Sequence, residues 1–182
     1  MKPIQLFSRT ALFLALMILS AYLQITLPTP FFSMHITMQL FTCIVCGFCL
    51  PVSYSVLCMG VYILIGLAGL PVFASGGGIQ YLMKPTFGFI LGFLFCSMAC
   101  SYFRQRKNPT SQKEYFLIGL IGLFLFYLMG NVYYYFSFPI LMQTRIPLWF
   151  SLFNGVIVSI LPDLCLCFFA CRVSKALQVL IQ

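Results

Sequence analysis

The sequence predicts an all-α membrane protein, and three observations support this fold class. Of the 182 residues, 62% are hydrophobic and only 7% are charged, whereas a soluble domain carries roughly 25% charged residues. The mean hydropathy is +1.05, and the apolar runs approach the roughly 20 residues that cross a bilayer as a helix. The period-2 alternation of a membrane β-barrel is absent. We therefore expect a polytopic bundle of helices in the lipid bilayer.

Six apolar segments are the expected spans of a single transmembrane domain, residues 1–182. They cover residues 10–27, 37–50, 52–70, 87–103, 115–138 and 147–171. The second and third are divided because one helix over residues 37–70 would measure about 51 Å, well beyond a hydrocarbon core of about 30 Å. Pro51 lies near the middle of that stretch, where a turn tolerates proline and a helix interior does not.

The charges test this span count. Ten Lys and Arg stand against two acids, an excess that could indicate nucleic-acid binding, but the cations lie between apolar runs rather than on one face. With six spans and the N-terminus inside, eight cations fall on the inner side (Lys2, Arg9, Arg104, Arg106, Lys107, Lys113, Arg172, Lys175) and two on the outer side (Lys84, Arg145). Five spans divide them six against four. We therefore expect six spans, cytoplasmic termini and a place in the cell membrane.

Catalytic and metal-binding chemistry has little support in the sequence. With two acids and one His, no catalytic pair or triad is evident, and we expect neither an enzyme nor a cofactor. The nine Cys lie in apolar runs without nearby His or acid, which is typical of small packing residues. A G-x-x-x-x-G-K-[ST] phosphate loop is absent, so uphill transport would need an ATPase partner or an ion gradient.

Asp163 is the most informative single residue. It follows Pro162 in the middle of the last expected span, where an ionised carboxylate is costly unless it faces a partner or water. Pro162 frees a backbone carbonyl one turn earlier, which suits an opened helix beside a pocket. Asp163 is therefore a candidate ligand-binding residue, and a hydrogen bond between helices is the structural alternative.

Three further features are candidates for function. The outer loop after the third span contains Ser75–Gly78, whose three consecutive glycines allow close approach of the backbone to a ligand or plain loop flexibility. Thr37 and Gln39 begin the second helix, where a lone Gln is usually interfacial. Ala11-x-x-x-Ala15 on the first helix permits close contact with another helix.

The segment GLPVFASGGGIQYLMKPTFGFILGF, residues 69–93, resembles the hallmark of the BioY family, the biotin-binding S components of energy-coupling-factor transporters. That hallmark joins a Gly-Leu-Pro-Val-Phe-Ala run, a glycine-rich loop and a Pro-Thr-x-Gly-[Tyr/Phe] element, here Pro85–Phe89. Ile36–Gln39 is similar to the family's Ile-Thr-x-Gln, and Asp163 to its aspartate of the sixth helix. The resemblance covers nearly the whole chain.

The resemblance implies a subunit that captures biotin outside and works with a transmembrane T component and two ATPases. Asp163 and Gln39 would bind the urea, Phe73 and Tyr81 would pack on the bicycle, and Ala11 and Ala15 would face the T component. The carboxylate tail would bind backbone N–H groups of the glycine loop or an outer cation. The implied ligand-binding residues are Gln39, Phe73, Ser75, Gly76, Gly77, Gly78, Tyr81, Lys84, Thr86, Arg145 and Asp163.

One position departs from the family pattern, and two other functions stay open. The family usually has a lysine three residues after the aspartate, where this chain has Leu166, so Asp163 lacks a cationic neighbour in sequence. A proton-coupled vitamin carrier working alone would use Asp163 as a relay. An integral-membrane lipid-modifying enzyme would need acids or metal ligands that the chain scarcely has.

Overall fold

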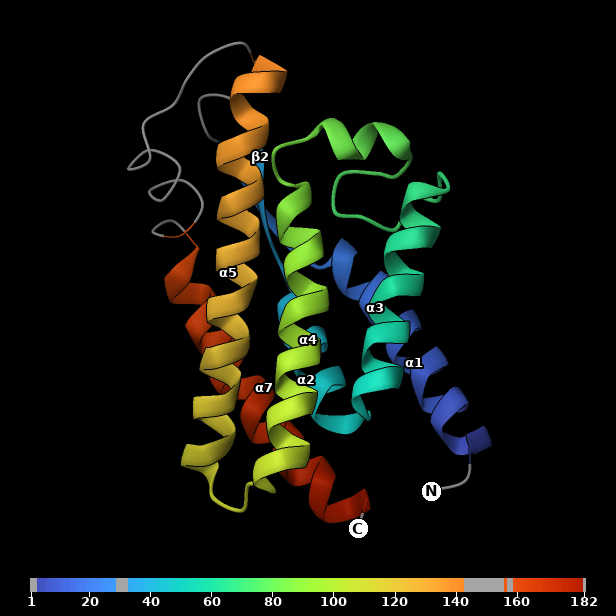
Figure 1. Ribbon diagram of the computed structural model, residues 1–182, viewed down its shortest axis with the longest axis vertical. Helices are drawn as coiled ribbons and strands as arrows, with labels where there is room; N and C mark the ends of the chain where they lie inside the picture. Colours follow the sequence, from blue (N-terminus) through green and yellow to red (C-terminus); the bar gives the residue numbers. More distant parts are fainter. Residues whose placement is uncertain (1–2, 29–32, 143–155, 157–158, 182) are drawn as a thin grey trace.

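The structure is a computed structural model that describes residues 3–28, 33–142, 156 and 159–181. Within these residues the α-helices are α1 (Pro3–Tyr22), α2 (Gln39–Cys49), α3 (Val52–Leu67), α4 (Phe87–Lys107), α5 (Gln112–Met142) and α7 (Ile160–Ile181) (Figure 1). Three of them, α1, α4 and α5, are long and apolar enough to cross a membrane, and α2 and α3 are shorter apolar helices. The predicted helical membrane fold is confirmed, while the count of six spans stays a prediction.

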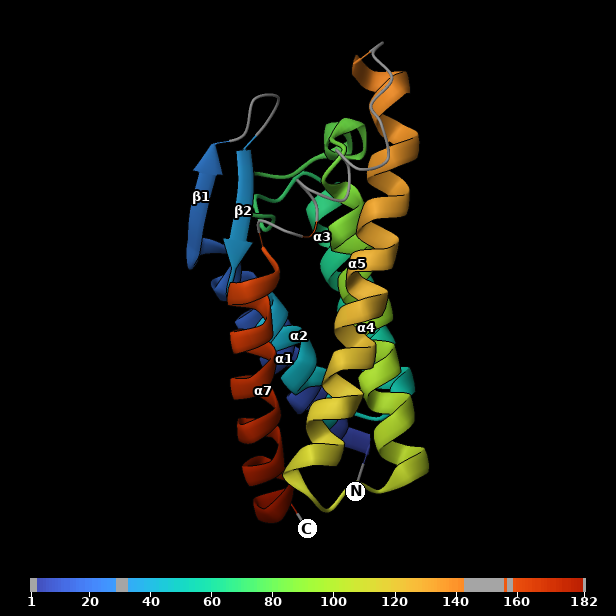
Figure 2. The same ribbon diagram turned by 90° about the vertical axis from the view of Figure 1, so that its left-hand side faces the viewer.

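The bundle has two distinct ends. Both termini lie at the same end as the turn between α4 and α5, and we call this the terminal end (Figures 1 and 2). A β-hairpin and the short 3₁₀-helix η1 (Ile79–Met83) lie at the opposite end, the hairpin end. The basic α4–α5 turn and the termini thus share one end of the bundle, as a common cytoplasmic location would require.

The hairpin is the main departure from a purely helical chain. The first span was expected to reach Leu27, but α1 ends at Tyr22 and the chain enters strand β1 (Gln24–Pro28), which pairs antiparallel with β2 (Ser33–Thr37). The strands contain Ile25, Thr26, Ile36 and Thr37, whose β-branched side chains favour extended backbone. The helical interpretation of this stretch was therefore wrong.

Asp163 also lies elsewhere than expected. The last span was placed at 147–171 with Asp163 near its middle, but α7 runs from Ile160 to Ile181 and has Asp163 in its first turn. Residues 143–155 lie outside the described part of the chain. The helix continues past the expected end at Cys171, and the charged side chain of Arg172 is exposed.

The terminal half of the core is closed by small side chains. A Cβ added to Gly47 of α2 would lie 2.6 Å from the Ser97 oxygen, and one added to Gly119 of α5 would lie 2.5 Å from the Cys171 sulfur. Eight of the nine free cysteines are buried, and among the described residues no group of three or more His, Cys, Asp or Glu is placed to hold a metal ion.

A candidate ligand-binding cavity

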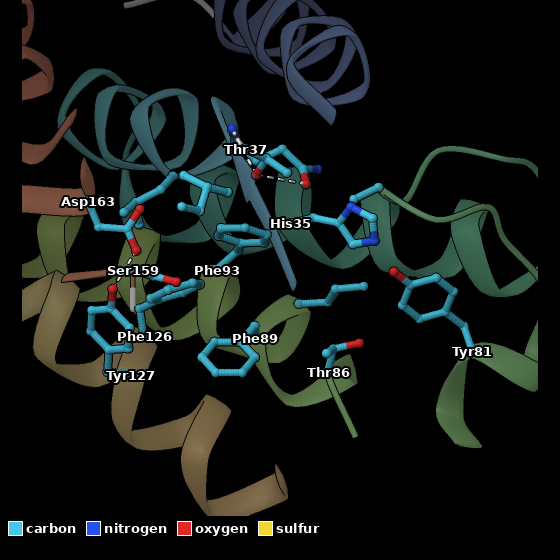
Figure 3. A pocket seen from close by; sticks show the side chains of 15 residues that line it. His35, Thr37, Tyr81, Thr86, Phe89, Phe93, Phe126, Tyr127, Ser159 and Asp163 are labelled. Carbon is cyan, nitrogen blue, oxygen red and sulfur yellow. Dashed lines mark hydrogen bonds between the residues drawn. The ribbon is translucent and has the colours of Figure 1, made fainter. Parts of the chain in front are cut away.

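A cavity opens between the helices in the hairpin half of the bundle (Figure 3). The space between its walls, with the open solvent of its mouth included, is about 700 Å³. Its walls come from β2, α2, the α3–α4 loop, η1, α4, α5 and α7. They consist of His35, Ile36, Thr37, Gln39, Leu40, Ala74, Tyr81, Thr86, Phe89, Ile90, Phe93, Phe126, Tyr127, Ser159 and Asp163.

Aromatic rings form one wall of the cavity. Phe89 and Phe93 lie four residues apart on α4 and therefore share a helix face. Phe126 of α5 stacks on Phe93 with ring centroids 5.1 Å apart and an interplanar angle of 27°, and it lies 5.5 Å from Phe89. This wall suits a flat or cyclic apolar ligand, since aromatic side chains bury large areas in fixed orientations.

Asp163 supplies the negative charge of the cavity. The residue is only 6% exposed, and the Tyr127 hydroxyl donates a hydrogen bond of 2.5 Å to its Oδ2 (Figure 3). Its place in the first turn of α7 lets the helix dipole stabilise the carboxylate. Tyr127 is the only protein donor to this carboxylate among the described residues, so Oδ1 remains available to a ligand.

Among the described residues of the cavity wall, the charge of Asp163 has no Lys or Arg as a counterpart. The one described lining residue whose side chain could become cationic near neutral pH is His35, at the mouth. Burial, and secondly Lys84, lower the pKa of His35 below its usual value of 6.5, so the imidazole is neutral at pH 7. A ligand that donates hydrogen bonds to Asp163 therefore meets an uncompensated carboxylate.

Gln39 lies in a polar cluster that ties the hairpin to α3. It is 3% exposed, and its Nε2 donates to the Tyr62 hydroxyl at 2.5 Å, which in turn donates to the Val72 carbonyl at 3.0 Å. The Thr37 hydroxyl is 3.4 Å from Gln39 Oε1. Because the amide nitrogen is engaged by protein, the oxygen is the part of Gln39 that retains capacity for a ligand.

The glycine loop is shaped mainly by its own hydrogen bonds. Gly76 and Gly78 have φ angles of 110° and 101°, a region that favours glycine. The N–H of Gly76 donates to Phe73 at 3.1 Å, and that of Gly78 donates to Gly66 at 2.7 Å. These two amides are therefore used within the protein rather than free for a ligand carboxylate.

A small cluster fastens this loop beside the cavity mouth. The ammonium of Lys84 donates to the Ser75 hydroxyl at 3.0 Å and lies 4.6 Å from the centroid of the Tyr81 ring. Ser75 Oγ and the Tyr81 hydroxyl are 3.0 Å apart. Burial raises the pKa of Tyr81, so the phenol is neutral and brings no negative charge that would compete with an anionic ligand group for Lys84.

The structure places the predicted residues in three groups. Four of them line the cavity: Gln39, Tyr81, Thr86 and Asp163. The adjoining loop contains Phe73, Ser75, Gly76, Gly77, Gly78 and Lys84, and Phe73 packs behind the cavity, 4.7 Å from the Tyr81 ring. Ala11 and Ala15 are exposed on α1 outside the lining, and Arg145 lies outside the described residues.

Sequence reasoning missed several lining residues. The largest group is aromatic: Phe89, Phe93, Phe126 and Tyr127. The i, i+4 spacing of Phe89 and Phe93 was a usable signal, but 36 residues separate Tyr127 from Asp163, and no local pattern joins them. No feature of the sequence singled out His35, which lies on β2 between the expected first and second spans.

Comparisons with known proteins agree with this architecture. A model of the BioY family matches residues 2–182. A probable biotin transporter BioY from Lysinibacillus sphaericus is 34% identical over 158 residues, which are 86% of this chain and 78% of the relative. The biotin transporter BioY from Thermotoga maritima is 30% identical over 160 residues, 84% of this chain and 90% of the relative.

The fold has a solved counterpart. The crystal structure of the S-component for biotin from an ECF-type ABC transporter superposes with a TM-score of 0.83, covering 98% of this chain and 94% of that chain at 24% identity. With its long apolar helices, the protein is a multi-pass protein of the cell membrane. Its family match, its relatives and its fold agree, and the chain belongs to the BioY family.

Proposed function

We propose that this chain is the substrate-capture subunit for biotin uptake across the cytoplasmic membrane, and that the cavity of the hairpin half is its biotin site. The observation that carries the proposal is the Asp163 carboxylate, which faces an aromatic-walled cavity with one oxygen free among the described residues. Relatives named as biotin transporters support the choice of ligand.

The cavity offers a partner to each part of the biotin bicycle, the polar urea and the apolar rings. The bicycle of biotin is apolar apart from a urea, whose N–H groups donate hydrogen bonds that a carboxylate accepts, and Asp163 offers such an acceptor. Phe93 and Phe126 provide the apolar wall beside it. Gln39 Oε1 retains acceptor capacity for a second urea N–H.

The valerate tail of biotin is anionic and would run toward the cavity mouth. Lys84 lies there, and the described groups around its ammonium, Ser75 and Tyr81, are neutral and do not compete with the tail for it. Two glycine amides of the loop are occupied by protein carbonyls, so in this arrangement Lys84 is the better candidate than the glycine backbone. Arg145 remains a second candidate cation.

Uphill transport also needs an energy source. We propose that two ATP-binding subunits supply it and that a transmembrane T component connects them to this chain. The chain contains no Walker-type phosphate loop. Ala11 and Ala15 lie one helical turn apart and are exposed on α1, and small residues at this spacing permit close contact with a partner helix. In this scheme the chain binds and carries its ligand and catalyses no reaction.

Equilibrium titration of the purified chain with biotin tests the ligand and the site. We expect a nanomolar Kd, about −12 kcal/mol, and a loss of roughly 5- to 150-fold on Asp163→Ala, the cost of about 1–3 kcal/mol for an unpaired buried partner. Glu114→Ala is the matched control, because it removes the only other acid of the chain far from the cavity. Equal affinities for wild type and Asp163→Ala would exclude Asp163 from the site.

An uptake assay separates this proposal from a carrier that works alone. Cells that lack every T component and its ATPases should accumulate no biotin above equilibrium through this chain. Accumulation in such cells that a protonophore abolishes would favour the proton-coupled carrier instead.

A further inference from the structure

A second pocket lies at the terminal end, where α4, α5 and α7 come together. It contains about 840 Å³ of empty space including its opening. Two cations from different helices line it, Arg104 of α4 and Lys175 of α7, and the rest of the lining is Asn108, Pro109, Thr110, Tyr115 and Gln178. No carboxylate belongs to this lining.

The one acid of the terminal end is occupied elsewhere. Glu114 Oε2 accepts hydrogen bonds from the N–H groups of Thr110 at 2.7 Å and Ser111 at 3.1 Å. The Glu114 N–H lies 3.3 Å from Ser111 Oγ. This reciprocal arrangement is a capping box at the start of α5. The carboxylate therefore serves the helix N-terminus, and among the described residues the two pocket cations have no acidic partner.

Arg104 differs from its neighbour Arg106 in its burial and in its hydrogen bonds. Arg106 is exposed and donates to the Tyr102 hydroxyl at 2.7 Å. Arg104 is half-buried, and its Nε is buried without a hydrogen-bond partner among the described residues. Leaving a buried charged donor unpaired is costly, and a phosphate oxygen within the pocket would remove this cost through a charge-assisted bond.

We propose that this pocket binds the phosphate of an anionic phospholipid headgroup. A guanidinium and an ammonium from two helices, with the hydroxyl-bearing Thr110 and Tyr115 in the same lining, match the charge and the acceptor oxygens of a phosphodiester. The pocket lies where the helices end, at the depth of headgroups rather than of acyl chains. Leu117 of α5 and Phe169 of α7 are exposed apolar residues on two of the helices that border the pocket, so these helices also present apolar surface to acyl chains. This site is independent of the biotin cavity.

Thermal unfolding in a neutral detergent tests the proposal. Because eight of the nine cysteines are buried and free, a fluorogenic thiol dye reports unfolding directly. We expect phosphatidylglycerol at about ten times its Kd to raise Tm by roughly 3–6 °C over phosphatidylcholine with the same acyl chains. Arg104→Gln and Lys175→Gln should each lose most of this increment, measured from the variant's own baseline. Arg106→Gln, the matched exposed control, should keep it.

Two further outcomes decide against the proposal. Equal stabilisation of wild type, Arg104→Gln and Lys175→Gln by phosphatidylglycerol would show general attraction to an anionic micelle and would overturn the site. Inorganic phosphate at constant ionic strength is the second arm. A phosphate shift that depends on Arg104, with no additional shift from phosphatidylglycerol, would assign the pocket to a soluble anion and overturn the lipid assignment.

Discussion

The two halves of the bundle use the same helices in opposite ways. In the terminal half, α2 and α7 approach α4 and α5 so closely that a Cβ on Gly47 or Gly119 would meet Ser97 or Cys171 at 2.6 or 2.5 Å. In the hairpin half, the rings of Phe89, Phe93 and Phe126 line a cavity among the helices (Figure 3). Side-chain size along each helix thus decides where the bundle is closed and where it holds a ligand.

The two halves also bury different kinds of polar group. The terminal half buries thiols that pack against glycine and donate at most weak hydrogen bonds, such as Cys100 to the Ile118 carbonyl and Cys171 to the Tyr115 carbonyl. The hairpin half buries a carboxylate, an amide and phenols that are arranged around the cavity. Tight packing therefore provides the scaffold on which the binding groups are held.

The largest expected effect comes from breaking the close approach in the terminal half. Gly47→Val forces a side chain against the Ser97 backbone, which cannot rotate away, so we expect destabilisation of about 3 kcal/mol or more, a fall in Tm of roughly 6 °C or more. Gly60→Val on α3 is the control, since nothing lies within 4 Å of its Cβ position. Similar thermal unfolding curves for both variants would show that the terminal half is not closely packed.

The next effect concerns the orientation of Asp163. Tyr127→Phe removes the hydrogen bond to Oδ2 and keeps the ring, so we expect biotin affinity to fall about tenfold or more, because bonds to charged groups contribute roughly 1.5–3 kcal/mol. Tyr135→Phe on the same helix is the control, as Tyr135 is exposed and outside the cavity lining. Titration calorimetry measures both, and equal affinities would separate Tyr127 from ligand binding.

A smaller effect tests the cation at the mouth. Lys84→Gln should weaken biotin about threefold at low salt, the scale of a partly exposed ion pair of up to roughly 1 kcal/mol, and should leave the methyl ester of biotin unaffected because its tail is uncharged. The mutant and wild type should converge as salt rises. Equal loss of affinity for biotin and its ester would mean that Lys84 acts through the loop structure rather than through charge.

The smallest effect is a pH dependence from His35. Its pKa is lowered in the folded state, by burial first and by Lys84 second, so the unfolded chain binds more protons just below the ordinary pKa of 6.5. This contribution to stability is fully present above that value and is lost as the pH falls. We expect Tm to decrease by about 2 °C or less from about pH 7.5 to about pH 5.5. In His35→Gln that component should be absent, and an unchanged profile would contradict it.

Much of the scaffold was predictable from the sequence, since long apolar runs and the break at Pro51 are local properties of the chain. The structure indeed starts α3 directly after Pro51, which has extended φ and ψ angles of −62° and 156°. The β-hairpin was not predictable from hydropathy, because Gln24–Leu27 is apolar enough to continue a span. Its pairing with Ser33–Thr37 depends on a contact between segments rather than on composition.

Composition alone predicted the candidate site only in its rarest residues, and the family resemblance added Tyr81 and Thr86 to the lining. Asp163 and Gln39 stood out because polar side chains are scarce in this chain, and both lie at the cavity. Phe126 and Tyr127 did not stand out among 21 Phe and 10 Tyr, since their role arises from the packing of α5 against α4 and α7. The glycine loop was recognised, but that two of its amides donate within the protein could be learned only from three-dimensional structure.

A structure of the purified chain with biotin bound is the most direct test of the central claim. The account predicts that the bicycle lies against Phe93 and Phe126, that a urea N–H donates to Asp163, and that the tail extends toward Lys84. Biotin located anywhere else, for example in the apolar groove between α5 and α7 lined by Leu123 and Leu164, would contradict it.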